Sequence, residues 1–150
     1  MKSSLDSFGR KILIALQRNA RCSIAELSRQ IGLSQTRTAE RLRRMQDAGI
    51  IQGYTVEIDR EALGLPLLAY IRLTCSGSSY HSFLKFVKSA DQVQECHHLT
   101  GGDAFLIKVT VASIGDLEKF VEKLLPYGDP ITSIVLSSPV AKNSLPVGLS

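Results

Sequence analysis

The sequence predicts an α+β protein in which a small helical domain precedes a domain with the element order βαββαβ. Three observations support this prediction. Apolar residues recur at the spacing of amphipathic helices through the first 48 residues. Beyond residue 66, four segments that alternate apolar and polar side chains are interleaved with segments of helical spacing. Basic residues are concentrated before residue 53, so the two parts also differ in charge.

Two helices are expected in the first 31 residues. The first carries an apolar stripe made of Leu5, Phe8, Ile12, Leu13 and Leu16. The second is expected from Ser23 to Ile31, because Ser23 followed by Glu26 three residues later forms a capping box. Gly32 then supplies a turn residue at which a positive φ costs little.

A third helix is expected from Ser34 to Ala48, with Ser34 as its N-cap and Gly49 as the residue that ends it. Its predicted inward stripe is Ala39, Leu42 and Met45. Its other faces carry Ser34, Gln35, Thr36, Arg37, Thr38, Arg41 and Arg44. A tight turn followed by a helix with such side chains is typical of a helix-turn-helix that enters the DNA major groove. The alternative is an ordinary helical hairpin with a solvated basic face.

The charge distribution favours DNA binding. Residues 1–52 contain ten Lys/Arg and four Asp/Glu, whereas residues 53–150 contain eight and ten. A basic amino-terminal third joined to a mildly acidic remainder is typical of a polyanion-binding domain attached to a domain with another role. The basic side chains would supply phosphate contacts and a salt-dependent affinity.

The remaining elements follow a connecting segment. Ile50–Ile58 alternates as a strand that acts as a linker, and a polar connector continues to residue 65. The strands expected beyond it are Leu67–Cys75, Val93–Leu99, Phe105–Val111 and Ile131–Ser137, and the expected helices are Ser82–Ala90 and a helix capped by Ser113. We therefore divide the chain into residues 1–52, 53–65, 66–142 and a tail at 143–150.

The order βαββαβ predicts a ferredoxin-like fold with both helices on one face of the sheet. The strands carry apolar residues on both faces: Leu106 and Thr110 lie opposite Ile107 and Val109. A bare apolar sheet face requires a partner. We therefore expect a homodimer, or a larger homo-oligomer of dimers, which suits a helix-turn-helix protein that reads a two-fold DNA site.

Composition narrows the location and the class of protein. No apolar run approaches the about 20 residues of a membrane span, and the first residues lack the apolar segment of a signal peptide. Cys22, Cys75 and Cys96 show no metal-like pairing and are expected to be reduced thiols. These features predict a cytoplasmic protein without a membrane partner.

Several motifs contain residue types that other kinds of site also use. Cys96-His97-His98 is too short a ligand set for zinc, because neighbouring strand residues point to opposite faces. Thr100-Gly101-Gly102-Asp103 lacks the spacing and the lysine of a P-loop, and a plain hairpin turn is its simplest interpretation. No nucleophile elbow and no carboxylate pair suited to acid–base catalysis is present. We therefore expect no catalytic residue, no metal site, no cofactor and no enzymatic activity.

Taken together, several segments resemble the Lrp/AsnC family of transcriptional regulators over residues 4–142. They are Leu5-Asp6 with Ile12-Leu13, Asn19–Ser23, Gly32-Leu33-Ser34, Arg41-Leu42, Met45, Ala48–Tyr54 and Leu99–Val109. The resemblance implies a DNA-binding domain joined to a ferredoxin-like regulatory domain, assembly into dimers or rings of dimers, and a small-molecule effector, commonly an amino acid. In the effector turn, many members have aspartate directly before the aromatic residue, where this chain has Ala104.

The expected sites follow from the motifs and from this resemblance. Double-stranded DNA is contacted by Ser34, Gln35, Thr36, Arg37, Thr38, Arg41 and Arg44, with Gln35 and Arg37 as base readers and Arg41 and Arg44 on phosphates. The effector turn comprises Thr100, Gly101, Gly102 and Asp103, bordered by His98. Two rival functions remain: a tetrapyrrole enzyme similar to the sirohaem decarboxylases, and an oligomeric interaction module that does not bind DNA.

Overall fold

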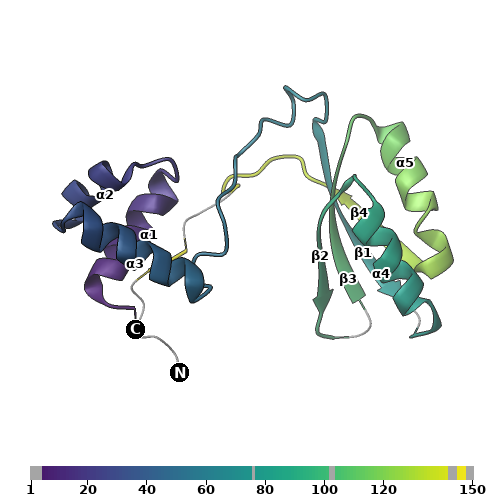
Figure 1. Ribbon diagram of the computed structural model, residues 1–150. Coiled ribbons are helices and arrows are strands. Elements are labelled where there is room, and N and C mark those ends of the chain that lie inside the picture. Colours follow the sequence, from purple (N-terminus) through teal and green to yellow (C-terminus); the bar gives the residue numbers. More distant parts are fainter. Residues whose placement is uncertain (1–4, 76, 102–103, 142–144, 148–150) are drawn as a thin grey trace. The chain divides into compact units, whose positions relative to one another are not determined.

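The computed structural model describes residues 5–75, 77–101, 104–141 and 145–147 (Figure 1). The chain forms two compact units. The first comprises residues 1–57 together with residues 140–150, and the second comprises residues 58–139. The boundaries predicted from the sequence stay predictions, and each unit is described below by itself.

The first unit contains three helices. They are α1 (Ser7–Arg18), α2 (Ile24–Ile31) and α3 (Gln35–Asp47). Each begins at a side-chain cap: Asp6 accepts from the Gly9 amide at 2.8 Å, and Ser23 and Ser34 cap α2 and α3 in the same way. The predicted caps at Ser23 and Ser34 are therefore confirmed, and each satisfies a backbone N–H that has no partner within its helix.

The helices enclose a small core of Ile12, Leu27, Ile31 and Met45. Gly32 ends α2 at φ +76° and Gly49 follows α3 at φ +68°, conformations that side chains with a Cβ rarely adopt. Both predicted turn glycines are thus confirmed. Away from the core, Gln17 on α1 donates to the Leu145 carbonyl at 3.3 Å and accepts from its amide at 2.6 Å. This pair fixes part of the carboxy-terminal segment on the first unit.

The inward face of α3 differs from the prediction at two positions. Thr38 is completely buried, and its hydroxyl donates to the Ser34 carbonyl at 2.9 Å. Ala39, which was expected inside, is exposed. The inward row of α3 therefore begins at Thr38 instead of Ala39 and continues through Leu42 and Met45 as predicted. The assignment of Thr38 as a DNA contact is corrected, because its side chain has no free surface.

The prediction of a strand at Ile50–Ile58 is wrong. This segment forms no strand (Figure 1). Its alternating apolar residues are exposed: Tyr54 by 49 %, Val56 by 80 % and Ile58 by 63 %. An alternating pattern becomes a strand only where a second strand supplies hydrogen bonds, and the described residues of this chain offer none to it.

The second unit follows the predicted order. Its elements are β1 (Leu67–Cys75), η1 (Gly77–Ser79), α4 (Tyr80–Ser89), β2 (Val93–Leu99), β3 (Ala104–Val111), α5 (Ile114–Glu122), η2 (Leu125–Tyr127) and β4 (Gly128–Ile134). β4 begins three residues before its predicted start. It does so because Gly128 pairs beside Cys75, where a Cβ would collide with the Thr74 carbonyl oxygen. Ser113 caps α5 as predicted, accepting from the Asp116 amide at 3.1 Å.

The sheet has the strand order β2-β3-β1-β4, and each neighbouring pair is antiparallel. Helices α4 and α5 cover one face (Figure 1), where Phe83 and Phe120 pack on a row of buried β1 and β3 residues. This is the ferredoxin-like arrangement that the element order predicts, and the α+β class is confirmed. The opposite face carries apolar and charged side chains: Tyr70, Arg72, Leu106, Lys108 and Ile131.

Candidate nucleic-acid interface and ligand turn

The first turn of α3 presents an exposed row of polar side chains. Ser34, Gln35, Thr36 and Arg37 are all exposed at this end of the helix. Gln and Arg can each make two hydrogen bonds to one base edge, and the first turn of a recognition helix is where such contacts occur. The structure thus leaves four of the predicted DNA contacts available to a ligand.

The four arginines of α3 divide into two classes. Within the described part of the chain, the side chains of Arg37 and Arg43 make no hydrogen bond or ion pair. Arg44 pairs with Glu40 one turn earlier, and both side chains are largely exposed. Arg41 is only half exposed and pairs with Asp6 of the α1 N-terminus at 2.6 Å. The two predicted phosphate contacts therefore differ: Arg44 pairs within its own helix and is largely exposed, whereas Arg41 pairs with the start of another helix and is less exposed.

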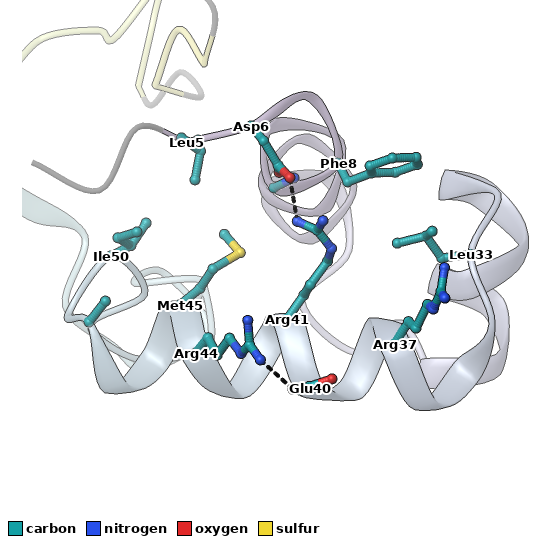
Figure 2. A pocket seen from close by; sticks show the side chains of 12 residues that line it. Leu5, Asp6, Phe8, Leu33, Arg37, Glu40, Arg41, Arg44, Met45 and Ile50 are labelled. Atoms are coloured by element: carbon teal, nitrogen blue, oxygen red, sulfur yellow. Dashed lines mark hydrogen bonds and ion pairs between the residues drawn. The ribbon is translucent and has the colours of Figure 1, made fainter.

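A groove of about 540 Å³ separates the start of α1 from α3 (Figure 2). Arg37, Arg41 and Arg44 line its α3 side, and Leu5, Asp6 and Phe8 line its α1 side. Figure 2 shows the Arg41 side chain reaching from α3 to the Asp6 carboxylate. The Arg41 guanidinium also lies 5.4 Å from the centre of the Phe8 ring, within cation–π range.

The sequence prediction missed two residues that bear on this interface. Arg43 belongs to α3 but was not among the predicted contacts. Because Leu42 and Met45 face inward, Arg43 lies on the solvent side of α3, and the predicted stripe already contained the signal that could have found it. Asp6 gave no local signal as a partner of Arg41, because 35 residues separate them.

The predicted effector turn is only partly described. Thr100 and Gly101 are exposed at the end of β2, and Gly101 has φ +96°, a conformation that favours glycine. Gly102 and Asp103 lie outside the described residues. The first two residues of the turn are therefore accessible to solvent, and the predicted acidic residue follows them in the sequence.

His98 lies beside this turn in an aromatic cluster. Its imidazole stacks on Phe105 with ring centres 4.6 Å apart and planes inclined by 16°. Tyr80 is the first residue of α4, and the centre of its ring lies 6.0 Å from that of His98 and 5.7 Å from that of Phe105. His98 thus forms part of a flat, partly polar wall next to the predicted effector turn.

The Cys96-His97-His98 triplet is divided between the two sheet faces. Cys96 and His98 pair with the helix-side residues Ile107 and Phe105, whereas His97 pairs with Leu106 on the opposite face. Burial raises the pKa of the Cys96 thiol, and Cys22, Cys75 and Cys96 are free cysteines. Among the described residues there is no group of three or more His, Cys, Asp or Glu side chains suited to a metal ion.

His97 instead lies beside an ion pair of Glu95 and Lys108 on the open sheet face. Glu95 accepts from Lys108 at 2.8 Å and lies 3.2 Å from His97. Lys108 first, and His97 second, hold the pKa of the Glu95 carboxyl below its ordinary value. In the segments that the structure covers, no helix combines the length and apolar character needed to cross a membrane.

Comparison with known proteins identifies both units. A sequence profile for winged helix-turn-helix DNA-binding domains matches residues 5–52, and the profile of the Lrp/AsnC ligand binding domain matches residues 68–145. The chain belongs to the Lrp/AsnC family. It is therefore a DNA-binding transcriptional regulator with a ligand-binding domain, as the sequence resemblance predicted.

Individual relatives agree with this assignment. LrpC of Bacillus subtilis is 30 % identical over 139 residues, which cover 93 % of this chain and 96 % of LrpC. The leucine-responsive regulatory protein of Escherichia coli K12 is 35 % identical over 124 residues, covering 81 % of this chain and 76 % of that protein. These relatives of the Lrp/AsnC chain are named as regulators and not as enzymes.

Solved structures share the whole fold. The regulator NMB0573 of Neisseria meningitidis, crystallised as a complex with L-Met, superposes with a TM-score of 0.91 at 30 % identity, covering 97 % of this chain and 98 % of its own. AsnC of Escherichia coli superposes with a TM-score of 0.82 at 32 % identity and covers 92 % of this chain and 96 % of its own. The Lrp/AsnC fold thus extends over both units of the chain.

Proposed function

We propose that this Lrp/AsnC regulator binds specific duplex DNA sequences through α3, and that a small metabolite, an amino acid, binds the Thr100–Asp103 turn and changes that binding. The observation that carries the proposal is the capped, exposed first turn of α3, where the Arg37 side chain has no partner among the described residues. A helix start with free Gln and Arg side chains suits base edges.

Within this proposal, base reading belongs to Gln35 and Arg37, with Ser34 and Thr36 beside them. Arg43 and Arg44 are the phosphate contacts, because the Arg43 side chain has no partner among the residues that the structure describes and the Glu40 pair of Arg44 is exposed and therefore weak. Phosphate contacts fix the position of a protein on the duplex, whereas base contacts give it sequence preference.

The effector site rests on the chemistry of the turn and its neighbour. Backbone N–H groups of a glycine turn can hold a carboxylate, and the Asp103 carboxylate can accept from an ammonium group. His98 and Tyr80 add an aromatic wall next to Thr100. The L-Met complex of the Neisseria regulator supports an amino acid as the ligand class.

The assembly proposed is a homodimer, or a larger oligomer of dimers, formed through the sheet face opposite α4 and α5. Ile131 is 66 % exposed on that face, beside Arg72 of β1. Two such faces stacked together would cover the apolar residues, and the dimer would carry two α3 helices for a two-fold DNA site. We place this assembly in the cytoplasm, together with the DNA.

A ligand screen tests the effector proposal. Each of the twenty amino acids is added to the full chain in a thermal-shift assay, since a ligand that binds only the folded state raises the melting temperature. A positive amino acid is then titrated by calorimetry into His98→Ala, into Asp103→Ala and into the control Lys88→Ala, an exposed residue in the last turn of α4.

The two site variants should lose ligand affinity and keep their DNA affinity in the absence of ligand. The control should bind the amino acid as the wild type does. Unchanged ligand affinity in Asp103→Ala would place the pocket elsewhere. If no amino acid shifts the melting temperature or the assembly, the turn is a plain hairpin and the effector proposal is wrong.

A further inference from the structure

Arg41 is held by two groups of α1. Its Nη1 donates to Oδ2 of Asp6 at 2.6 Å, and its guanidinium lies 5.4 Å from the centre of the Phe8 ring (Figure 2). Lys11 lies over the same ring at 5.7 Å. The Arg41 side chain is therefore directed along the groove toward α1 and is engaged there before any DNA arrives.

The carboxylate of Asp6 has two structural roles, as the cap of α1 and as the partner of Arg41. Its Oδ1 caps α1 by accepting from the Gly9 amide at 2.8 Å, while its Oδ2 accepts from Arg41. The Gly9 hydrogen bond first, and the Arg41 hydrogen bond second, lower the pKa of Asp6 from its ordinary value. The same group thus fixes the beginning of α1 and ties it to the middle of α3.

The other arginines of α3 are not held in this way. Arg37 and Arg43 have no side-chain partner in the described ranges, and Arg44 bonds only to Glu40 of its own helix. A contact within one helix cannot orient that helix against another. Of these four side chains, Arg41 is the one whose recorded interactions connect α3 to α1.

We infer that Arg41 is a positioning residue that, with Asp6 and Phe8, sets the orientation of α3 against α1, and that it is not a phosphate contact. The inference rests on the proposed binding of DNA through α3. A cation that contacts a phosphate releases condensed counterions and adds to the salt dependence of binding. A cation already neutralised by Asp6 adds little to that dependence, although its loss disturbs the surface that reads the DNA.

The test measures DNA affinity by fluorescence anisotropy at several salt concentrations, using the full chain and one selected duplex. The key variant is the double substitution D6N/R41Q, which keeps the net charge of the wild type. Asn is as good an N-cap as Asp, so the α1 cap is retained while the ion pair is removed. Arg43→Ala is the matched control for loss of a free α3 cation.

The expected results distinguish a change in the salt dependence of DNA binding from a change in DNA affinity. A plot of the logarithm of the DNA association constant against the logarithm of the salt concentration has a negative slope. Arg43→Ala should reduce the steepness of this slope by about 0.9, the value for one phosphate contact. D6N/R41Q should keep the wild-type slope and lose affinity roughly two- to fivefold at every salt concentration, the scale of an exposed ion pair. R41Q alone, which keeps a side-chain amide donor for Asp6, should bind DNA better than R41A.

A phosphate-contact role would give different results. If D6N/R41Q lowers the slope as much as Arg43→Ala does, Arg41 contacts DNA and the inference is overturned. Equal affinities of R41Q and R41A would also count against it. Circular dichroism confirms that each variant is folded before titration. A wild-type chain that fails to bind any duplex would contradict the proposed function instead, so the two failures are distinguishable.

Discussion

The Thr38 hydroxyl donates a 2.9 Å hydrogen bond to the carbonyl oxygen of Ser34, the residue that caps α3. Thr38 is completely buried, so its position marks the side of α3 that faces the core, and this hydrogen bond satisfies the buried hydroxyl. Thr36, two residues earlier, is exposed on the far side of the helix. Two threonines so close in sequence therefore have opposite environments, which makes them a matched pair.

Replacing each threonine by valine tests this orientation. Thr38→Val removes a satisfied buried hydroxyl and keeps the side-chain shape, so the free energy of unfolding should change by no more than about 1 kcal/mol. DNA affinity should stay within twofold of the wild type. Thr36→Val should leave stability unchanged and weaken binding to the selected duplex. Anisotropy and urea unfolding measure both effects, and the reverse pattern would show that the α3 surface is assigned incorrectly.

Arg37 and Arg44 should differ in the kind of binding they support. Arg37→Ala should cost about 1–3 kcal/mol on a specific site and relax the preference for one base pair, because Arg37 lies in the base-reading first turn. Arg44→Ala should weaken specific and unrelated duplexes alike. Binding of a panel of single-base variants of the selected duplex, at one fixed salt concentration, measures this. Equal binding by Arg37→Ala and the wild type would remove Arg37 from the base readers.

The contribution of Asp6 to stability should depend on pH. Its folded pKa is lowered from the ordinary value of 3.8, so its carboxylate stabilises the fold above that pH. This stabilisation is lost as the pH falls below 3.8 and through the lowered folded pKa. The difference in unfolding free energy between the wild type and Asp6→Asn should therefore shrink as the pH is reduced. A difference that stays constant over that range would contradict the assignment.

The open sheet face can be tested with two isoleucines of equal exposure. Ile131 on β4 is 66 % exposed and lies beside Arg72, whereas Ile114, the first residue of α5, is 67 % exposed on the helical layer. Ile131→Glu should dissociate the proposed dimer, because it buries a charge in the interface. Ile114→Glu should not. Sedimentation velocity at micromolar concentration distinguishes them, and a dimeric Ile131→Glu chain would place the interface elsewhere.

The elements of the fold were largely predictable because their signals are local. Ser23, Ser34 and Ser113 each precede a helix and cap it, so the serine itself marks the helix start. The apolar rows of α5 and β3 likewise depend only on spacing along the chain. For this reason the order of helices and strands was predicted correctly from residue 67 to residue 134.

The remaining features depend on groups distant in the sequence. The alternation in Ile50–Ile58 looked like a strand, but alternation does not supply a partner strand. Ala39 was placed inside instead of Thr38 because alanine is the more apolar residue, although the Thr38 hydroxyl is satisfied by its own helix and can therefore be buried. The Asp6–Arg41 ion pair connects two helices that are distant in the sequence, and no local sequence pattern predicts such a pair.

The most direct test of the whole account is the specificity of DNA binding. A duplex is selected from a random pool with the full chain, and its dissociation constant is compared with that of a scrambled duplex at physiological salt. If α3 reads base edges, the selected duplex should bind about a thousandfold more tightly, at the lower end of specific regulators, and Arg37→Ala should reduce this ratio. A ratio near one, with both duplexes bound equally, would contradict sequence-specific recognition by α3.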